Sequence, residues 1–419
     1  MSTSRRWRCP PGALLVRSGL TGAAVAQMCL CSTPASVFAE ELRVDASVQD
    51  TVLYSSNIPL SPIRESGWGD NLGASVSLSR RSETNQLSAG VGLALNRYTD
   101  PKFNTNDAFV SLSEYQQLER DQLGIVAQYA LQSYRAAQLA QTGLNLGYQQ
   151  VETLVVTPQW SRSLTERLSS TLAVSYSQAH YDTPGLVNYW SPGAALSLNY
   201  TASERLTAGV TFSYAKFNTT PFTSSSETWG TTVNASYLAT ENLTLLASVG
   251  GEHVRTEQQE TILVCPTEAL LCQLGLVQYI PVGAVGTSEQ FVVPYSVGLK
   301  WRMSETQDLE ASASQQVLPN GTGALLGSKQ FVAIYRQALS ATWNFTLLVN
   351  YTISTFLSGA HISNYLAVSP SVGWQIDEAW SANAGYSFLQ STGYGVPSAQ
   401  ANVVFATIRY AWPLLSTSH

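Results

Sequence analysis

Histidines beside acidic residues are the side chains of this sequence best suited to acid–base catalysis. His180 precedes Tyr181 and Asp182, and His253 follows Glu252. A serine hydrolase sets its histidine between an acid and a serine that often stands in a Gly-x-Ser-x-Gly turn. The sequence has no such turn. We therefore predict no catalytic residues and no enzyme, and a lipid hydrolase is the third of three hypotheses.

A glycine-rich segment at 320–329 superficially resembles a phosphate-binding loop. Its Lys329 follows Ser328, whereas a phosphate-binding loop has its lysine before the Ser or Thr, and no helical pattern comes after it. The segment is therefore predicted to be a surface turn, and no cofactor is expected.

Two of the five cysteines, Cys265 and Cys272, lie in a long insertion and are separated by six residues. In an oxidising compartment such a pair is expected to form a loop-closing disulfide. A structural metal site needs more ligands than this segment offers, so no metal is predicted.

Eight short polar turns give the chain its organisation. Five of the seven steps between successive turns are 36 to 38 residues long, with alternating apolar and polar residues between them. The turns lie at 82–87, 118–121, 164–168, 203–206, 240–243, 304–309, 339–343 and 377–380. One hairpin plus one loop has this period. The pattern predicts an all-β, up-and-down antiparallel barrel.

Eight turns join sixteen strands, and segments 42–54 and 402–412 add one strand at each end. We predict about eighteen strands, or sixteen if segment 132–150 pairs differently, with both termini on the side of the short turns. A barrel of this size leaves an aqueous channel.

The alternation separates an apolar face from a polar one. Leu168, Leu172 and Val174 share one face, opposite Ser169 and Thr171. Charged residues are only 12% of the chain, about half the share usual in soluble domains. No apolar run is long enough for a transmembrane helix. These features predict a transmembrane β-barrel in contact with outer-membrane lipid.

The first 39 residues have the pattern of a signal peptide. Arg5, Arg6, Arg8 and Arg17 precede an apolar stretch, and 37–39 read Val-Phe-Ala. We predict a cleaved signal peptide at 1–39, an outer-membrane barrel at 40–412 and a short C-terminal tail at 413–419. The expected location is the outer membrane of a Gram-negative bacterium.

Aromatic residues recur at two heights on the predicted strands. Those near the turns and those about eight residues further along are separated by roughly 20 Å along a tilted barrel axis. This separation predicts two interfacial girdles around an apolar band. The predicted girdle residues are Trp160, Tyr176, Tyr200, Tyr214, Tyr237, Trp301, Trp343, Tyr351, Trp374, Trp380, Tyr386 and Trp412.

The predicted lumen is lined mainly by Ser, Thr, Asn, Gln and Gly, with scattered charges of both signs. A selective anion pore would need a concentrated basic ring. We therefore favour a weakly selective path for uncharged polar solutes, although small polar residues also fill any barrel interior. The predicted lumen charges are Arg43, Asp45, Lys300, Arg302, Glu310, Arg336 and Arg409.

Three segments carry a resemblance to a family of largely uncharacterised Gram-negative outer-membrane β-barrel porins. They are 48–57 (VQDTVLYSSN), 78–85 (LSRRSETN) and 164–168 (LTERL). Some members of that family are found near exopolysaccharide or surface-protein sorting loci. The resemblance implies place and shape and brings no catalytic residue. The alternating aromatics of the last strand also resemble the signal read by the barrel-assembly machinery, which would then be a partner.

Two functions remain as hypotheses. The first is a porin-like passive channel for small polar solutes or saccharides. The alternative is a non-conducting barrel that displays loops 55–67, 132–148 and 257–288 as an adhesin, receptor or partner platform of an exopolysaccharide or surface-assembly system. The net charge of −6 gives no reason to expect nucleic acid as a partner.

Overall fold

The computed structural model describes residues 41–145, 150–182, 185–220, 224–264, 280–357, 360–393 and 396–418. The predicted signal peptide at 1–39 and the predicted disulfide pair Cys265 and Cys272 lie outside these residues.

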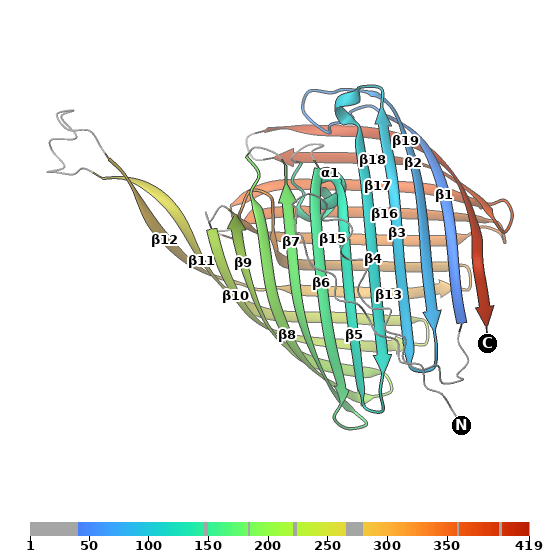
Figure 1. Cartoon of the computed structure of the whole chain (residues 1–419), viewed down its shortest axis with the longest axis horizontal. Helices are drawn as coiled ribbons and strands as arrows, with labels where there is room; N and C mark the ends of the chain where they lie inside the picture. Colours follow the sequence, from blue (N-terminus) through green and yellow to red (C-terminus); the bar gives the residue numbers. More distant parts are fainter. Residues whose placement is uncertain are drawn as a thin grey trace, which may run out of the picture. The chain divides into compact units, whose positions relative to one another are not determined.

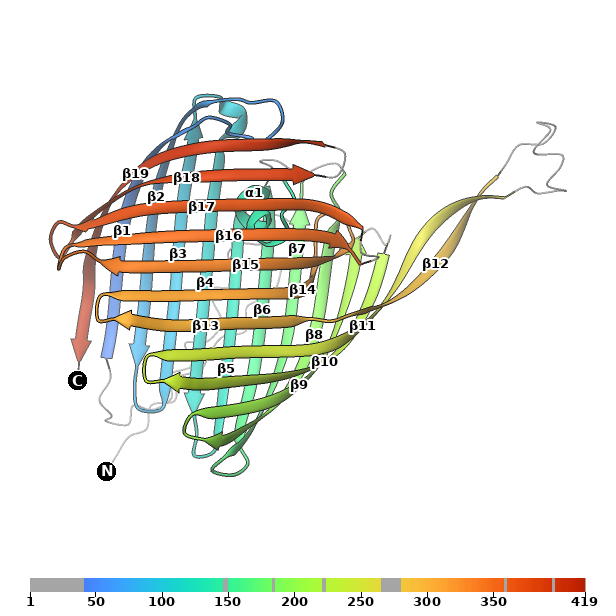
Figure 2. The ribbon, with the colours of Figure 1, turned by 180° about the vertical axis from the view of Figure 1, so that it is seen from behind.

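The chain forms one antiparallel sheet that closes on itself, because the first strand pairs with both the second and the last. Figure 1 shows the strands running around a barrel, and Figure 2 shows the opposite wall. The strands are β1 (Glu41–Ser55), β2 (Gly67–Arg81), β3 (Asn85–Tyr98), β4 (Thr105–Gln117), β5 (Asp121–Ser133), β6 (Gln150–Ser163), β7 (Leu168–Tyr181), β8 (Asn188–Ser203), β9 (Leu206–Thr220), β10 (Ser224–Thr240), β11 (Leu243–Val264), β12 (Ile280–Val292), β13 (Tyr295–Ser304), β14 (Gln307–Pro319), β15 (Leu325–Ala338), β16 (Trp343–Phe356), β17 (His361–Gln375), β18 (Trp380–Gly393) and β19 (Val396–Ser418).

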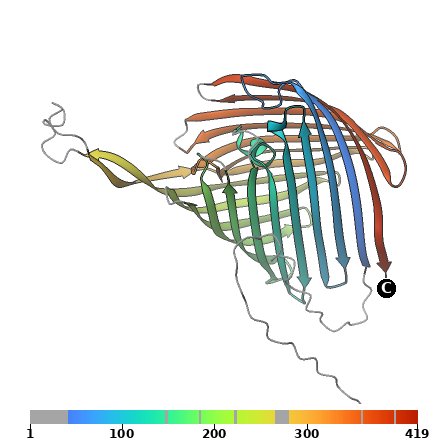
Figure 3. The ribbon, with the colours of Figure 1, turned by 45° about the horizontal axis from the view of Figure 1, so that its top comes forward.

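The barrel wall consists of eighteen strand positions, as predicted, and we call these positions staves. The nineteen described strand segments fill eighteen staves because β12 and β13 follow one another along a single stave. Residues 243–249 of β11 pair with β13, and residues 252–264 of β11 pair with β12. Pro294 separates β12 from β13, and proline has no N–H to donate to a ladder. The β11–β12 pair extends beyond the barrel wall (Figures 1 and 3).

All eight predicted short turns join consecutive strands, from Ser82–Thr84 between β2 and β3 to the turn between β17 and β18. We call this end of the barrel the short-turn end and the opposite one the long-loop end. Both ends of the described chain lie at the short-turn end, where Glu41 pairs with Ser418 and with Arg81.

The last residues differ from the prediction of a free tail at 413–419. Residues 413–418 continue β19 and pair with the start of β1. The register shifts by one residue between Val44 and Asp45, opposite Pro413. A bulge accommodates the missing proline donor there, so the strand continues past it.

One face of the sheet carries polar side chains that bond across the strands. Ser47 Oγ lies 2.9 Å from Ser75 Oγ, and Thr51 Oγ1 lies 2.8 Å from Thr407 Oγ1. The alternate residues on the other face, such as Val48, are large, apolar and exposed. The period of two therefore gives a polar inner face and an apolar outer face.

Among the described residues, two short helices interrupt the strand pattern, α1 (Tyr134–Thr142) and the 3₁₀ helix η2 (Pro101–Phe103). No helix in the described ranges is long and apolar enough to cross a membrane.

Candidate functional site: the constriction around α1

Helix α1 lies inside the barrel near the long-loop end (Figure 1). After Ser133 the chain leaves the wall and turns inward, so α1 contacts β5 and β6 on one side and β15 and β16 on the other. Residues 132–148 were predicted to be a displayed surface loop. That prediction is wrong for 134–142, because this segment buries Tyr134 and Leu139 against the inner wall.

The C-terminal turn of α1 is fixed by polar side chains of the opposite wall. The last carbonyls of a helix have no partner within it, and here five inward-facing side chains of β15 and β16 donate to them. The bonds are Ser328 Oγ to Gln141 O (2.6 Å), Gln330 Nε2 to Ala140 O (3.0 Å), Asn350 Nδ2 to Ala140 O (3.1 Å), Thr352 Oγ1 to Ala140 O (2.8 Å), and Ser354 Oγ to Thr142 O.

Gly143 ends the helix with a φ of 64°, a conformation in which glycine carries no steric penalty. Its N–H donates to Leu139 O at 2.8 Å. A Cβ at this position would lie 3.3 Å from Ser363 Oγ on β17. The glycine therefore allows the helix end to approach the wall closely.

Replacing Thr352 with valine is expected to lower the free energy of local unfolding of α1 by about 1–2 kcal/mol. The substitution keeps the side-chain shape but leaves the Ala140 carbonyl with one donor fewer. Hydrogen exchange of the α1 amides in the folded barrel should quicken accordingly. Thr346→Val, on the same strand and face, is the control and should leave these amides unchanged.

One face of α1 packs into an aromatic cluster that fills part of the lumen. Tyr134 lies 6.1 Å from Tyr181, Tyr181 lies 6.4 Å from Tyr189, and Tyr189 lies 5.3 Å from Phe217, measured between ring centroids. Leu325 of β15 packs against the same cluster from the facing wall. Burial raises the pKa of Tyr134, so its phenol stays neutral. This side of the lumen is closed by packed side chains.

The opposite face of α1 borders an open cavity. Five residues of a helix turn through roughly 140°, so Leu139 points away from Tyr134 and joins Tyr365, Ala399 and Leu60. Between this cluster and β1–β4 lies a cavity of ≈ 390 Å³.

The cavity carries charges of both signs on a wall of mixed polar and apolar side chains. Asp107 of β4 and Arg135 of α1 both line it, together with Asn71, Asn96 and Tyr98. Asn96 Nδ2 donates to Asp107 Oδ2 at 2.9 Å and to Thr105 Oγ1 at 2.9 Å. The carboxylate is therefore held in a fixed position facing the space beside α1.

The segment after β1 closes the outer rim of this cavity. Asn57, Ile58 and Leu60 are buried, so this part of the predicted display loop 55–67 is folded inward. Arg135 Nη1 donates to Ile58 O, and Asn145 Nδ2 donates to Pro59 O and Leu60 O at 2.8 Å each. Leu60 has a φ of 47°, a conformation that these contacts hold in place.

The lumen charges predicted from the sequence lie on inward-facing positions near the short-turn end, away from α1. Arg43 Nε lies 2.7 Å from Asp45 Oδ2, and Arg409 Nη2 donates to Ser47 Oγ at 3.4 Å. Arg336 Nη1 lies 2.9 Å from Asp308 Oδ2 and 3.1 Å from Glu310 Oε1. Lys300 and Arg302 stand opposite Glu310 and Asp308 in the β13–β14 register. Opposite charges thus neighbour one another, and these residues do not narrow the lumen.

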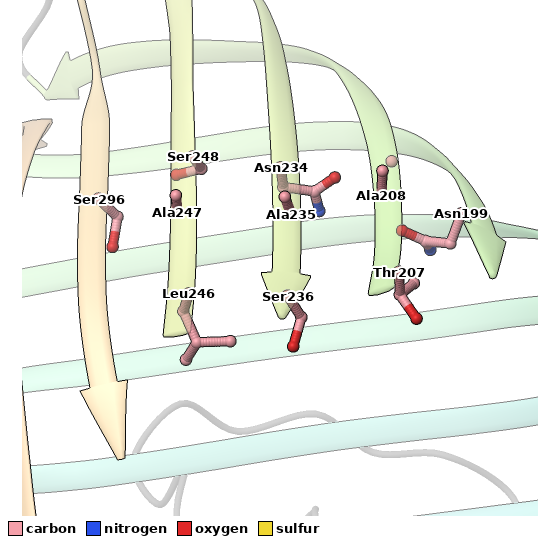
Figure 4. Close-up of a pocket in the computed structure, with 11 residues that line it drawn as sticks. Asn199, Thr207, Ala208, Asn234, Ala235, Ser236, Leu246, Ala247, Ser248 and Ser296 are labelled. Carbon is pink, nitrogen blue, oxygen red and sulfur yellow. The ribbon is translucent and has the colours of Figure 1, made fainter. Parts of the chain in front are cut away.

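The inner wall toward the short-turn end is polar and uncharged where β8–β11 and β13 meet (Figure 4). A Cβ at Gly209 would lie 2.4 Å from Asn199 Oδ1 and 2.5 Å from Asn234 Oδ1. Glycine is therefore needed for the two amides to converge there, in a recess of ≈ 310 Å³.

The aromatic residues predicted as girdles lie on the outer face of ten strands, and the side chains of all but Trp412 are among the exposed large hydrophobic groups. Trp343 and Trp374 stack on neighbouring strands, with ring centroids 5.4 Å apart and planes inclined by 5°.

The histidines weighed for catalysis are separated on the wall. His180 Nε2 lies 3.1 Å from Asp182 Oδ1, and His253 Nε2 lies 3.6 Å from Glu289 Oε2. The first pair lies at the end of β7, and the second lies within the β11–β12 ladder.

The glycine-rich segment at 320–329 is not the surface turn that was predicted. Asn320 and Ser328 are fully buried, Ser328 bonds to α1, and Gly321 O accepts from Val187 N at 2.8 Å. The segment turns inward because α1 and the aromatic cluster give its polar and apolar groups partners.

Asp107 and Arg135 were missed as site residues. Asp107 lies in an ordinary strand pattern and Arg135 in a segment without a clear period. Only the inward fold of α1 brings them to one cavity.

The chain has no match among known protein families or curated protein sequences. Among solved structures its fold is similar to Acinetobacter baumannii OccAB4, at 8% sequence identity over 90% of this chain and 98% of that one, with a TM-score of 0.47. It is also similar to the copper transporter OprC (9% identity, 87% and 66% covered, TM-score 0.47) and to Pseudomonas aeruginosa OpdL (9% identity, 89% and 99% covered, TM-score 0.43). Likeness at this level concerns the fold, and no functional argument rests on it.

Proposed function

We propose that this barrel spans the outer membrane as a passive channel for small polar solutes, with saccharides as the favoured class. One observation carries the proposal: α1 narrows the lumen but leaves a cavity beside it, in which Asp107, Arg135 and the amides of Asn71 and Asn96 share the lining with apolar side chains such as Leu53 and Leu389. Amide and hydroxyl groups can exchange hydrogen bonds with an uncharged polar solute. The tyrosines Tyr98 and Tyr365 on the same cavity offer ring faces to its carbon skeleton.

Reconstitution in planar bilayers tests this function directly. Purified full-length protein is expected to give discrete conductance steps that shrink as neutral polymers small enough to enter the constriction are added. A folded barrel that inserts and stays silent would contradict the proposal. Polymers too large to enter serve as the control and should leave the steps unchanged.

A second function is favoured by the β11–β12 extension. β11 has 22 residues, and its pair with β12 continues far past the barrel wall (Figure 3). Such a projection could bind a partner of an exopolysaccharide or surface-assembly system. A silent barrel that binds glycans, and loses that binding when the extension is shortened, would support this function instead.

A further inference from the structure

Two carboxyl groups lie on the outer face of the barrel, within the otherwise apolar band. Asp50 of β1 pairs in register with Leu72 and Ile408, both exposed outer-face residues, and it alternates with Val48 and Val52. Asp70 of β2 stands directly opposite Val52. The two acidic side chains are close neighbours on adjacent strands, and Asp50 Oδ1 is out of contact with solvent and has no hydrogen-bond partner among the described residues.

These acids lie between the two aromatic levels, where the exposure of a charged group to lipid is unfavourable in free energy. Tyr54 and Trp68, 5.3 Å apart between ring centroids, mark the upper aromatic level, four residues beyond Asp50, or about 10 Å along the axis of a tilted barrel. On the other side Val48 pairs with Tyr410, which neighbours Trp380 at the lower level. Ionisable groups at this depth are rare on lipid-facing surfaces and usually have a protein partner.

A cation that has no carboxylate partner in the described part of the chain lies on the same surface. Arg97 of β3 stands directly opposite Asp70 in register and is exposed. Its guanidinium donates to Asn96 O (2.9 Å), Thr105 O (3.1 Å) and Asn106 Oδ1 (2.7 Å), all of them neutral acceptors. The face therefore carries acids on β1 and β2, the base Arg97 on β3 and a second base, Arg80, near the short-turn end of β2.

The lower aromatic girdle is also interrupted over these strands. Trp160 of β6 belongs to it, but its direct neighbour on β5 is Leu123. Throughout β1–β5, which are described in full, the outward positions near the short turns carry no Trp or Tyr. Interfacial aromatics are enriched where a barrel meets lipid headgroups, so their absence indicates that something other than lipid covers this sector. Many of the outward residues there are small or aliphatic, including Val44, Ala46, Leu78 and Leu87, and the charged Arg80 and Glu114 lie among them.

We propose that the outer face of β1–β3 is the contact surface between two copies of this chain. A two-fold axis normal to the membrane preserves the height of every residue, and an isologous interface centred on β2 sets β1 of one copy against β3 of the other. Asp50 on β1 of each copy then lies against β3 of the partner copy, which carries Arg97, and this pairing is made twice, on either side of Asp70 at the axis. The inference rests on the proposed membrane location.

Charge variants test the pairing. The full-length protein in mild detergent is expected to have the mass of a dimer. Arg97→Asp sets like charges against the acids of this face and should raise the dissociation constant at least about tenfold. Asp50→Lys combined with Asp70→Lys makes it wholly basic and should do the same. Co-expression of the two variants should restore a mixed dimer, an outcome that only pairing between chains explains.

Two further measurements keep the result unambiguous. Lys329→Asp reverses an exposed charge on the outer face of β15, away from the proposed interface. This variant should keep the mass of a dimer in detergent. In a background with Cys265 and Cys272 replaced by serine, Leu72→Cys is expected to cross-link two chains in membranes, whereas Val372→Cys is not. Heat-dependent gel mobility confirms that each variant is a folded barrel.

A folded, membrane-inserted wild type that is monomeric would overturn the inference, and so would a complex in which a different polypeptide covers this face. Failure of the protein to float with membranes would instead remove the proposed location.

Discussion

Replacing residues 134–142 with a glycine–serine linker is expected to raise the single-channel conductance at least about twofold. A helix with its side chains occupies a disc about 10 Å across, and α1 lies within the lumen, in contact with β5 and β6 and with β15 and β16. The closed ladder of eighteen staves does not depend on α1, because every stave pairs with both neighbours through its own backbone. Planar-bilayer recordings would measure the change, and the size limit for neutral polymers should rise with it.

Gln141→Ala is the matched control for this deletion. The Gln141 side chain is exposed, and only its carbonyl accepts the bond from Ser328. The variant should therefore conduct like the wild type. Equal conductance of the linker variant and the wild type, with both barrels folded, would mean that solutes do not pass beside α1.

Neutralising the two cavity charges is expected to shift ion selectivity in opposite directions. Asp107→Asn should favour anions and Arg135→Gln should favour cations, because each removes one sign of charge from the same cavity. A unit charge at 4 Å contributes about 1 kcal/mol even in water, so each permeability ratio should change on the order of fivefold. Reversal potentials across a salt gradient would measure both shifts.

The salt concentration and a control variant far from the cavity test whether the selectivity shifts arise from the cavity charges. At 0.1 M salt the screening length is about 10 Å, so recordings at or below this concentration are the most sensitive. Arg336→Gln removes a charge that lies near the short-turn end beside Asp308 and Glu310 and should change selectivity little. If Arg336→Gln moved the reversal potential as much as Arg135→Gln, the constriction would not control selectivity.

The regular part of the fold could be predicted from the sequence because it follows from local rules. Turn residues such as those at 82–87 and 203–206 recur at fixed intervals, and the alternation between them assigns each side chain to one face of a strand. A one-residue slip would move every apolar side chain to the polar face. Turn positions, strand count and the polar lumen wall therefore depend on residues close together in the sequence.

Asp50 shows the limit of pattern reading on the outer face. It occupies an apolar position in the alternation of β1, and only the pairing of β1 with β2 sets it beside Asp70 and near Arg97. The sequence alone offered no reason to group residues that lie twenty and forty-seven positions apart.

The sequence by itself determined the barrel, its eighteen staves and the polarity of its two faces, because the alternation of apolar and polar residues involves only neighbouring positions in the chain. Only the tertiary structure decided which loops turn inward. Helix α1 is nine residues long, too short to be stable in isolation, and it forms because Ser328, Thr352 and Tyr181 on distant strands satisfy its carbonyls and bury its aromatic face. The constriction depends on those long-range contacts, and no local pattern encodes them.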